Sequence, residues 1–136
     1  MRAILLLVLL LITNSSLALV LNPDNVKTPG SFCTVQDPNF KEYRYKEQIP
    51  VCNRNVMSSL KKKVYASYNV PENEMALYTI DHKIPLSMGG SNSQDNLWPQ
   101  PRVTTSAVLE LLVFNLIKED RISQKEALDL VLSVKK

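Results

Sequence analysis

The segment Tyr78–Gln100 constrains this chain more than any other part of its 136 residues. It holds the only histidine and the only tryptophan of the sequence, and two of its three glycines. Enrichment in β-branched and aromatic residues predicts a strand over 76–84. Gly89 and Gly90 then predict a tight turn with positive φ, which lets the chain double back. We therefore expect a hairpin here, with the other elements built around it.

Asp81 and His82 lie near the end of the predicted strand. A carboxylate is a hard oxygen ligand suited to a divalent cation, and an imidazole can take up a proton near neutral pH. If the next strand and helix return across the hairpin, the two side chains face a common pocket. A cation there would stabilise the charge on a phosphorus centre under attack, while His82 deprotonates the attacking water.

Asn96 begins the return of the chain and has two possible uses. Its amide oxygen can reach the metal, or its side chain can tie the loop backbone so that His82 is held in position. Leu97 and Trp98 are expected to anchor the return strand in the core. Pro99 and Pro101 are expected to fix the entry into the following helix.

This arrangement resembles the HNH, or His-Me finger, family of nucleases. The ββα-metal unit of that family has a strand carrying Asp-His, a Gly-Gly-x-Asn loop, an Asn-Leu return and a helix. The likeness is to the small exported bacterial type with Asn-Leu-Trp-Pro in the return, over about twenty residues, with a looser continuation from Glu110 to Ala127. The matching residues are Asp81, His82, Pro85, Leu86, Gly89, Gly90, Asn92, Asn96, Leu97, Trp98 and Pro99.

The resemblance implies an α+β fold with a small ββα-metal hairpin at its core and flanking helices. It also implies a metal-dependent endonuclease that hydrolyses nucleic-acid phosphodiester bonds, with DNA favoured over RNA. His82 would be the general base and Asp81 a ligand of the divalent metal, Mg²⁺ or alternatively Mn²⁺. Many family members place a second metal-binding histidine in the helix, whereas His82 is the only histidine here. Asn96 is therefore the leading second ligand, and Glu110 is the reserve candidate.

Several basic residues are candidates for contact with nucleic-acid phosphates. Lys83 and Arg102 flank the motif, and solvent exposure without a function is the alternative for both. Three consecutive lysines lie largely off the apolar face of a predicted helix and would extend the electrostatic path of the strand, or would simply be solvated. These are Lys61, Lys62 and Lys63. The main rival function is a catalytically inactive nucleic-acid-binding protein that keeps the HNH fold, and a second rival is a hydrolase of another exported substrate.

Residues 1–18 are typical of a secretory signal peptide, with a basic start, an apolar run over 3–12, and Ser16 and Ala18 placed for cleavage after Ala18. A membrane anchor is the alternative, but this run is about half of the roughly twenty residues that cross a bilayer. We therefore expect an exported protein, periplasmic or secreted, that is soluble after cleavage. Removing Arg2 leaves 15 basic and 13 acidic residues, a net charge of +2 that permits a polyanionic partner without demanding one.

Cys33 and Cys52 are the only cysteines. An oxidising compartment favours a disulfide between them, whose loop closure would stabilise the fold by roughly 3 kcal/mol. A structural zinc site is the alternative, but it needs four Cys or His ligands and the chain has three such residues. We therefore predict the disulfide.

The remaining segments predict one globular domain over 19–136, in which an N-terminal arm and disulfide loop (19–52) precede the HNH-like nuclease domain (53–136). We expect the arm to be loose up to about residue 27 and a short strand over 42–46. Apolar spacing predicts a helix over 54–68, with Asn53 as its N-cap. A helix over 103–118 should be buried on more than one side. Ser123 and Glu126 then match a capping box that starts a last helix.

Overall fold

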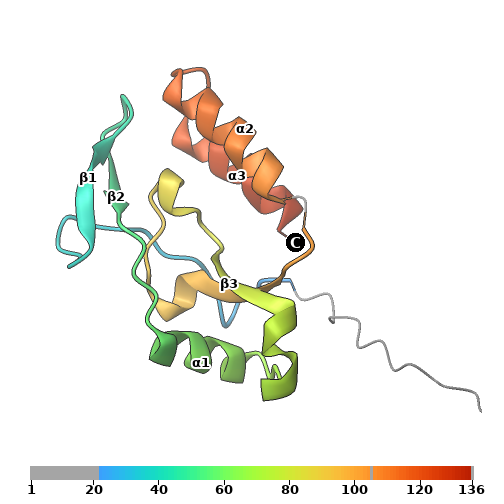
Figure 1. Ribbon diagram of the computed structural model, residues 1–136. Helices are drawn as coiled ribbons and strands as arrows, with labels where there is room; N and C mark the ends of the chain where they lie inside the picture. Colours follow the sequence, from blue (N-terminus) through green and yellow to red (C-terminus); the bar gives the residue numbers. More distant parts are fainter. Residues whose placement is uncertain (1–21, 105, 136) are drawn as a thin grey trace, which may run out of the picture.

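A computed structural model describes residues 22–104 and 106–135, and the expected signal peptide of residues 1–18 lies outside them. The described chain is mixed α+β, with two separate two-stranded antiparallel hairpins and three α-helices (Figure 1). The strands are β1 (Phe40–Arg44), β2 (Ile49–Cys52), β3 (Tyr78–His82) and β4 (Leu97–Pro101). The α-helices are α1 (Ser58–Ser67), α2 (Ser106–Lys118) and α3 (Gln124–Val134). Short 3₁₀ helices are η1 (Glu72–Leu77), η2 (Leu86–Met88) and η3 (Gln94–Asn96).

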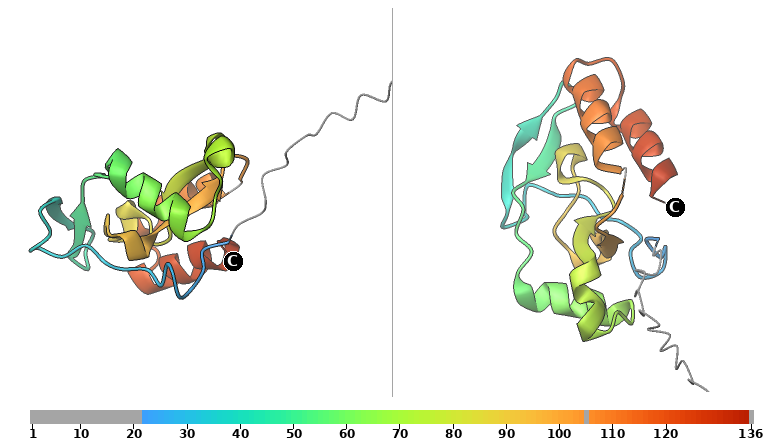
Figure 2. Two further views of the ribbon diagram at one scale, coloured as in Figure 1. Left: turned by 90° about the horizontal axis from the view of Figure 1, so that it is seen from below. Right: turned by 45° about the vertical axis from the view of Figure 1, so that its right-hand side comes forward.

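The β3–β4 hairpin lies between α1 on one side and α3 on the other (Figure 2). Asp81 pairs with Trp98 and His82 with Leu97 across the hairpin. Because successive side chains of a strand point to opposite faces, Asp81 and Trp98 share one face, and His82 and Leu97 share the other. The face of His82 is packed on α1 through a buried cluster of Val64, Ile80 and Leu97. The two residues of the Asp-His pair therefore lie on opposite faces of a hairpin that is covered on both sides.

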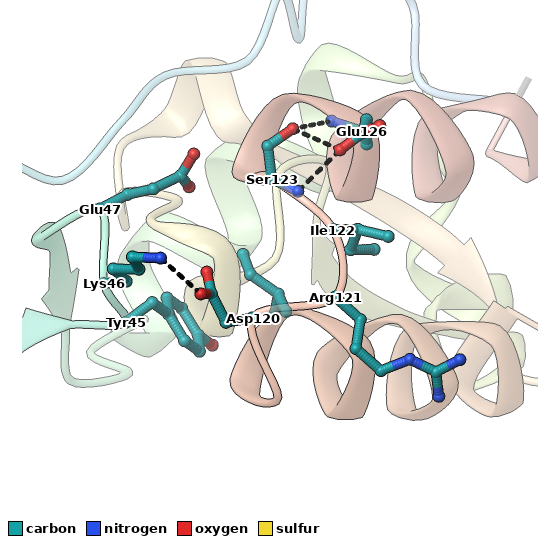
Figure 3. Close-up of a pocket in the computed structure, with 9 residues that line it drawn as sticks. Tyr45, Lys46, Glu47, Asp120, Arg121, Ile122, Ser123 and Glu126 are labelled. Atoms are coloured by element: carbon teal, nitrogen blue, oxygen red, sulfur yellow. Dashed lines mark hydrogen bonds and ion pairs between the residues drawn. The ribbon is translucent and has the colours of Figure 1, made fainter.

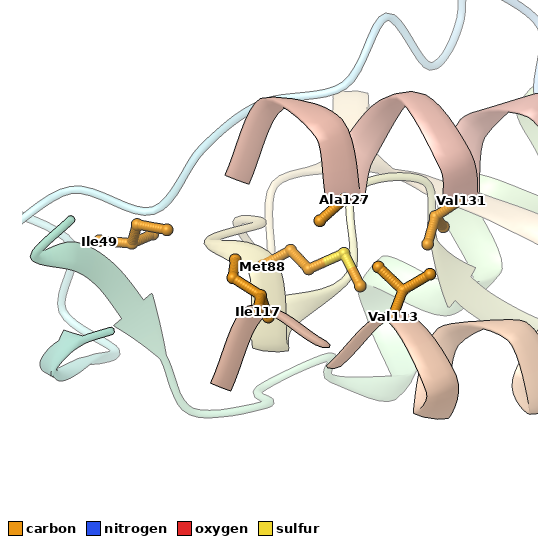
Figure 4. Close-up of a cluster of buried hydrophobic side chains, with 6 residues drawn as sticks. All are labelled: Ile49, Met88, Val113, Ile117, Ala127 and Val131. Atoms are coloured by element: carbon orange, nitrogen blue, oxygen red, sulfur yellow. The ribbon is translucent and has the colours of Figure 1, made fainter. Parts of the chain in front are cut away.

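A second core joins the other hairpin to the helix pair α2–α3. Met88 of η2 is completely buried at its centre, between the two helices and Ile49 of β2 (Figure 4). The remaining buried members come from α2 and α3, and they are Val113, Ile117, Ala127 and Val131. This cluster fixes the long loop that follows β3 against α2 and α3, so the loop is part of the folded core.

The two glycines of the turn are needed for different reasons. Gly89 has φ of 89°, so it takes the left-handed conformation that the sequence predicts. Gly90 does not have a positive φ, and a Cβ at this position would lie 1.9 Å from the carbonyl oxygen of Ile84. The prediction of positive φ is therefore right for Gly89 and wrong for Gly90, where the close approach of the loop backbone excludes any side chain.

The predicted helix over 54–68 begins later than its apolar spacing indicates. The helix α1 starts at Ser58, its N-cap is Met57 without a side-chain hydrogen bond, and Asn53 is not a cap. Residues 53–55 instead contact the region of His82, because Arg54 donates to the carbonyl oxygen of Ile80 (2.6 Å) and the amide of Asn55 donates to Asn92 (3.1 Å). These tertiary contacts hold the residues of the first predicted turn outside the helix.

The C-terminal helices follow their local signals more closely. The capping box of α3 is present, with Ser123 and Glu126 bonded reciprocally (Figure 3). The helix α2 buries only one stripe, since Val108 and Leu111 are 76% and 62% exposed, so the prediction of burial on more than one side is wrong. Its apolar composition indicated a core helix, but α3, the η2 loop and residues of the β1–β2 hairpin cover only one side of it.

The N-terminal arm is anchored at Pro23 and Thr28, which are buried, while residues 24–27 between them are exposed. Thr28 is fully buried and bonds to the hydroxyl of Tyr68 (2.7 Å) and the carbonyl oxygen of Leu97 (3.0 Å). The predicted disulfide joins Cys33 to Cys52, with an S–S distance of 2.05 Å. It ties the arm to the end of β2, immediately before residues 53–55, which contact the region of His82.

The short strand predicted over 42–46 appears as β1, shifted towards the N-terminus, and it pairs with β2, which the sequence analysis did not predict. Pro99 and Pro101 lie within β4, so they belong to the return strand and do not lead into the helix. Leu97 and Trp98 are 1% and 3% exposed, which confirms that they anchor that strand. Within the described residues, none of the helices has the length and apolar character needed to cross a membrane.

Candidate active site at the end of strand β3

His82 is the last residue of β3 and is only 2% exposed. Its Nε2 lies 3.1 Å from Oδ1 of Asn92, and its Nδ1 lies 3.2 Å from a guanidinium nitrogen of Arg54. Arg54 also donates to the carbonyl oxygen of Ile80 on the same strand (2.6 Å). The imidazole is thus held on both nitrogens by residues from two different loops.

The partners of His82 fix its tautomer. The Nδ2 group of Asn92 donates to the carbonyl oxygen of Asn53 (2.8 Å), and its Oδ1 accepts from the backbone amide of Asn55 (3.1 Å). The amide oxygen therefore faces Nε2 of His82, so this nitrogen carries the proton. The arginine can only donate, so Nδ1 of His82 presents its lone pair to Arg54.

The electrostatic environment keeps His82 neutral at physiological pH. Burial lowers the pKa of His82 from 6.5 to about 4; the hydrogen bond to Asn92 opposes this shift, and the nearby charge of Arg54 adds to it. A neutral imidazole with a lone pair on Nδ1 has the protonation state that a general base requires.

Asp81 points to the other face of the hairpin, where its partner is a lysine from the end of α3. Nζ of Lys135 lies 3.0 Å from Oδ2 of Asp81, 2.7 Å from Oε1 of Glu110 and 2.7 Å from the carbonyl oxygen of His82. The Lys135 side chain is 1% exposed, and the two carboxylates are about a quarter exposed. Burial raises the pKa of Glu110, while Lys135 pulls it down. The fold therefore brings Asp81 of β3 and Glu110 of α2 to the same lysine.

The expected common pocket of Asp81 and His82 does not form in this structure, because the pleat of β3 sends the two side chains to different partners. They still flank the same end of the strand, where the carboxylate of Asp81 partly opposes the lowering of the pKa of His82 by burial. The strand end thus has a neutral base on one face and an acidic pair on the other.

The donor set on the acidic face suits a magnesium or manganese ion in kind, since Asp81, Glu110 and the carbonyl of His82 are all hard oxygen donors. Within the described residues, however, no group of three or more His, Cys, Asp or Glu side chains is placed to hold a metal ion. An ion held by one or two carboxylates relies on water and substrate phosphates for its other ligands. Asp81 and Glu110 could therefore supply part of the ligand set of such an ion, and its remaining ligands would have to come from elsewhere.

Asn96 is used to hold the loop, the second of its two predicted uses. Its Oδ1 accepts from the amide of Ile84 (2.9 Å), and its Nδ2 donates to the carbonyl oxygens of Ile84 (3.0 Å) and Ser91 (2.9 Å). The side chain is fully buried. Both ends of the amide are occupied by backbone, so the geometry favours Glu110 over Asn96 as the partner of Asp81 in binding a metal.

The basic candidates differ in their surroundings. Lys83 is 9% exposed and donates to Asn25 (2.7 Å) and to the carbonyl oxygen of Thr28 (2.9 Å), so it docks the N-terminal arm and is not a solvated residue. Burial lowers the pKa of Lys83. Arg102 is exposed and donates to the carbonyl oxygen of Ala76 (2.8 Å). The lysines 61–63 are exposed on α1.

Arg54 and Lys135 are the two site residues that the sequence analysis did not single out. Arg54 lies in a segment that apolar spacing assigns to a helix, and Lys135 lies beyond the apolar repeat of α3. Neither belongs to the motif, and a basic residue at an element boundary has no local pattern that indicates a partner. Asn92 belongs to the motif, so its position could have been expected, but its contact with His82 could not.

Two hollows lie near opposite ends of α3. One of about 570 Å³ is lined by both buried lysines, Lys83 and Lys135, together with residues of the N-terminal arm and Leu132. The other, of about 190 Å³, lies at the start of α3 beside the capping box (Figure 3). The charged groups of the smaller hollow are paired, as with Lys46 and Asp120 at 2.8 Å. The larger of these two adjoins the acidic face through Lys135, and another hollow, of about 380 Å³, is lined by Glu110.

Comparison of the chain with protein-family models, with curated proteins and with solved structures gave no match.

Proposed function

We propose that this protein is a metal-dependent endonuclease of the HNH type, exported to the periplasm or the medium, that hydrolyses phosphodiester bonds of nucleic acid. The observation that carries the proposal is the arrangement at the end of β3. A neutral histidine with its proton on Nε2 lies on one face, and two carboxylates from β3 and α2 meet on the other. The order strand, strand, helix (β3, β4, α2) agrees with the ββα-metal unit that the motif implies.

His82 would act as the general base through Nδ1. Its proton on Nε2 is held by Asn92, so Nδ1 is the nitrogen that can accept a proton from water. In this structure Arg54 occupies that lone pair at 3.2 Å. Base catalysis therefore requires the guanidinium to move away from Nδ1.

A phosphate group provides a reason for Arg54 to move. The residue is exposed, and among the described residues it makes no ion pair with a carboxylate. An arginine has five N–H donors in a fork that suits phosphate oxygens, and two of its nitrogens are engaged here. We infer that Arg54 takes up the substrate phosphate and, in doing so, frees Nδ1 beside it.

Asp81 and Glu110 would hold the divalent ion on the other side of the strand end, with Mg²⁺ as the expected ion and Mn²⁺ as the alternative. Because the two faces meet at the end of β3, the phosphate would have to lie at that strand end for such an ion to neutralise its charge and that of the leaving oxygen. Asn96 supports the site indirectly, because its three backbone bonds fix the loop that carries Asn92.

The proposal is tested by incubating residues 19–136 with plasmid DNA and with single-stranded RNA, with Mg²⁺, Mn²⁺ or a chelator. We expect cleavage, with DNA favoured, that the chelator stops and that His82→Ala and Asp81→Asn abolish. Asp129→Asn is the matched control, because Asp129 is an exposed carboxylate on α3. No cleavage by the wild type, or equal cleavage by His82→Ala, would show that the catalytic assignment is wrong.

The second candidate is a nucleic-acid-binding protein that keeps this fold without catalysis. It is favoured by one observation: both reactive groups are occupied by basic residues of the same chain, His82 by Arg54 and Asp81 by Lys135. This candidate predicts retention of DNA on a gel without cleavage in any metal, and retention that His82→Ala leaves unchanged.

A further inference from the structure

Lys135 has all the contacts that a bound cation would need at the acidic face. An ammonium group has three N–H donors, and the three oxygens within 3.0 Å of Nζ belong to Asp81, Glu110 and the carbonyl of His82. The side chain is 1% exposed, so water does not compete for these positions. The ammonium is therefore coordinated by the same oxygens that a divalent ion would use.

A cation lowers the electrostatic repulsion within this cluster. Two carboxylates that are mostly shielded from water would repel each other, and removing the positive partner of a buried pair is strongly unfavourable. With Lys135 in place the cluster has a net charge of −1, and without it the charge would be −2. A positive charge from the chain or from the solution lowers this repulsion.

The position of Lys135 allows a metal ion from solution to replace its ammonium group. It follows the last residue of α3, and its side chain also lines the hollow of about 570 Å³ between the N-terminal arm and Leu132. A long, flexible side chain at a helix end can leave its partners without disturbing the buried core of α3, and the hollow offers space for it.

We propose that Lys135 is the resident cation of the Asp81–Glu110 pair and competes with a divalent ion for it. Divalent metal binds when the ammonium is displaced, so Lys135 sets the metal affinity of the site. This inference rests on the proposed function, because it takes the same two carboxylates as metal ligands.

The test is a titration with Mn²⁺ alone, followed by electron paramagnetic resonance of the free ion. Lys135→Met removes the charge, and Lys135→Gln removes it while keeping a hydrogen-bonding group. We expect both variants to bind one Mn²⁺ at least about tenfold more tightly than the wild type, because the competing charge is gone. Adding Asp81→Asn to Lys135→Met should abolish this binding. The control is Lys125→Met, which removes an exposed lysine of the same helix and should bind like the wild type.

Three outcomes overturn the inference, and they bear differently on the proposed function. Equal Mn²⁺ affinity in the wild type and both Lys135 variants, lost with Asp81→Asn, disproves the competition but leaves the metal site intact. Absence of binding in every variant disproves both the competition and the metal site. Weaker binding in the Lys135 variants also disproves the competition, provided that circular dichroism shows the variants folded. If Lys135→Met alone fails to fold, Lys135→Gln decides.

Discussion

Each face of the β3–β4 hairpin carries a basic side chain, and the two faces differ in how the charge of that side chain is balanced. On one face, Lys135 is almost wholly buried and bonded to three oxygens, so its charge is compensated. On the other face, Arg54 is exposed and touches a neutral histidine and a carbonyl oxygen, and no carboxylate of the described residues pairs with it. The acidic face is thus stabilised by an internal cation, whereas the histidine face presents a positive charge to solvent, where it could bind an anion.

The largest expected difference between the faces is in metal binding. Substitutions on both faces should reduce cleavage, but only a substitution on the acidic face should also remove Mn²⁺ binding. Under the proposed function, His82→Gln and Asp81→Asn each reduce the rate of plasmid cleavage by at least about 100-fold, the usual contribution of a general base or a bound metal. Only Asp81→Asn should also lose Mn²⁺ binding, measured by isothermal titration calorimetry. Loss of Mn²⁺ binding in His82→Gln would mean that the two faces do not have separate roles.

The histidine face should also make the fold sensitive to acid. The pKa of His82 is lowered from 6.5 to about 4 in the folded protein, so the unfolded chain binds the proton first as pH falls. The stability that depends on keeping His82 neutral is fully present above pH 6.5. It falls progressively towards pH 4, by about 3 kcal/mol in the free energy of unfolding. Urea unfolding at pH 7, 6, 5 and 4 with a chelator present measures it. The difference between the wild type and His82→Gln should shrink along this series; a constant difference would contradict the assigned environment of His82.

On the acidic face, removing the internal cation should cost a smaller amount of stability. Lys135→Met leaves Asp81 and Glu110 facing each other, and we expect a loss of about 2 kcal/mol in the free energy of unfolding, less than for fully buried pairs because both carboxylates are about a quarter exposed. Lys125→Met, which breaks an exposed pair with Asp129, should cost no more than about 0.5 kcal/mol. Equal losses for the two variants would show that Lys135 is not a specific partner.

The parts of this structure that were predictable from sequence are those that local signals determine. The capping box of Ser123 and Glu126 starts α3, Gly89 takes its positive φ, and the two cysteines form their disulfide, because each depends on residues close in sequence or on the small number of alternatives. The motif also placed the hairpin and its return strand.

The parts that were not predictable depend on contacts between distant segments. The start of α1 moved to Ser58 because Arg54 and Asn55 bond to the loop and strand of the hairpin, a tertiary effect that outweighs helical spacing. Lys135 meets Asp81 only because α3 folds back under the hairpin. The departure from local rules at Arg54 occurs beside the candidate base, where such departures are expected.

The smallest expected effect tests the contact that distinguishes the histidine face. Arg54→Met removes a positive charge near His82 and should raise the pKa of His82, by less than one unit because burial is the largest cause of its lowering. His82 is the only histidine, so nuclear magnetic resonance titration of the imidazole in untagged protein reports on this residue alone. The same spectra should show the proton on Nε2 in the wild type, as the bonds of Asn92 require. Arg121→Met is the control, since Arg121 is an exposed arginine that pairs with Glu119. A proton on Nδ1, or a pKa of His82 that falls in Arg54→Met, would remove the basis for treating Arg54 as the group that covers the base, because a cation next to an unprotonated nitrogen can only lower its proton affinity.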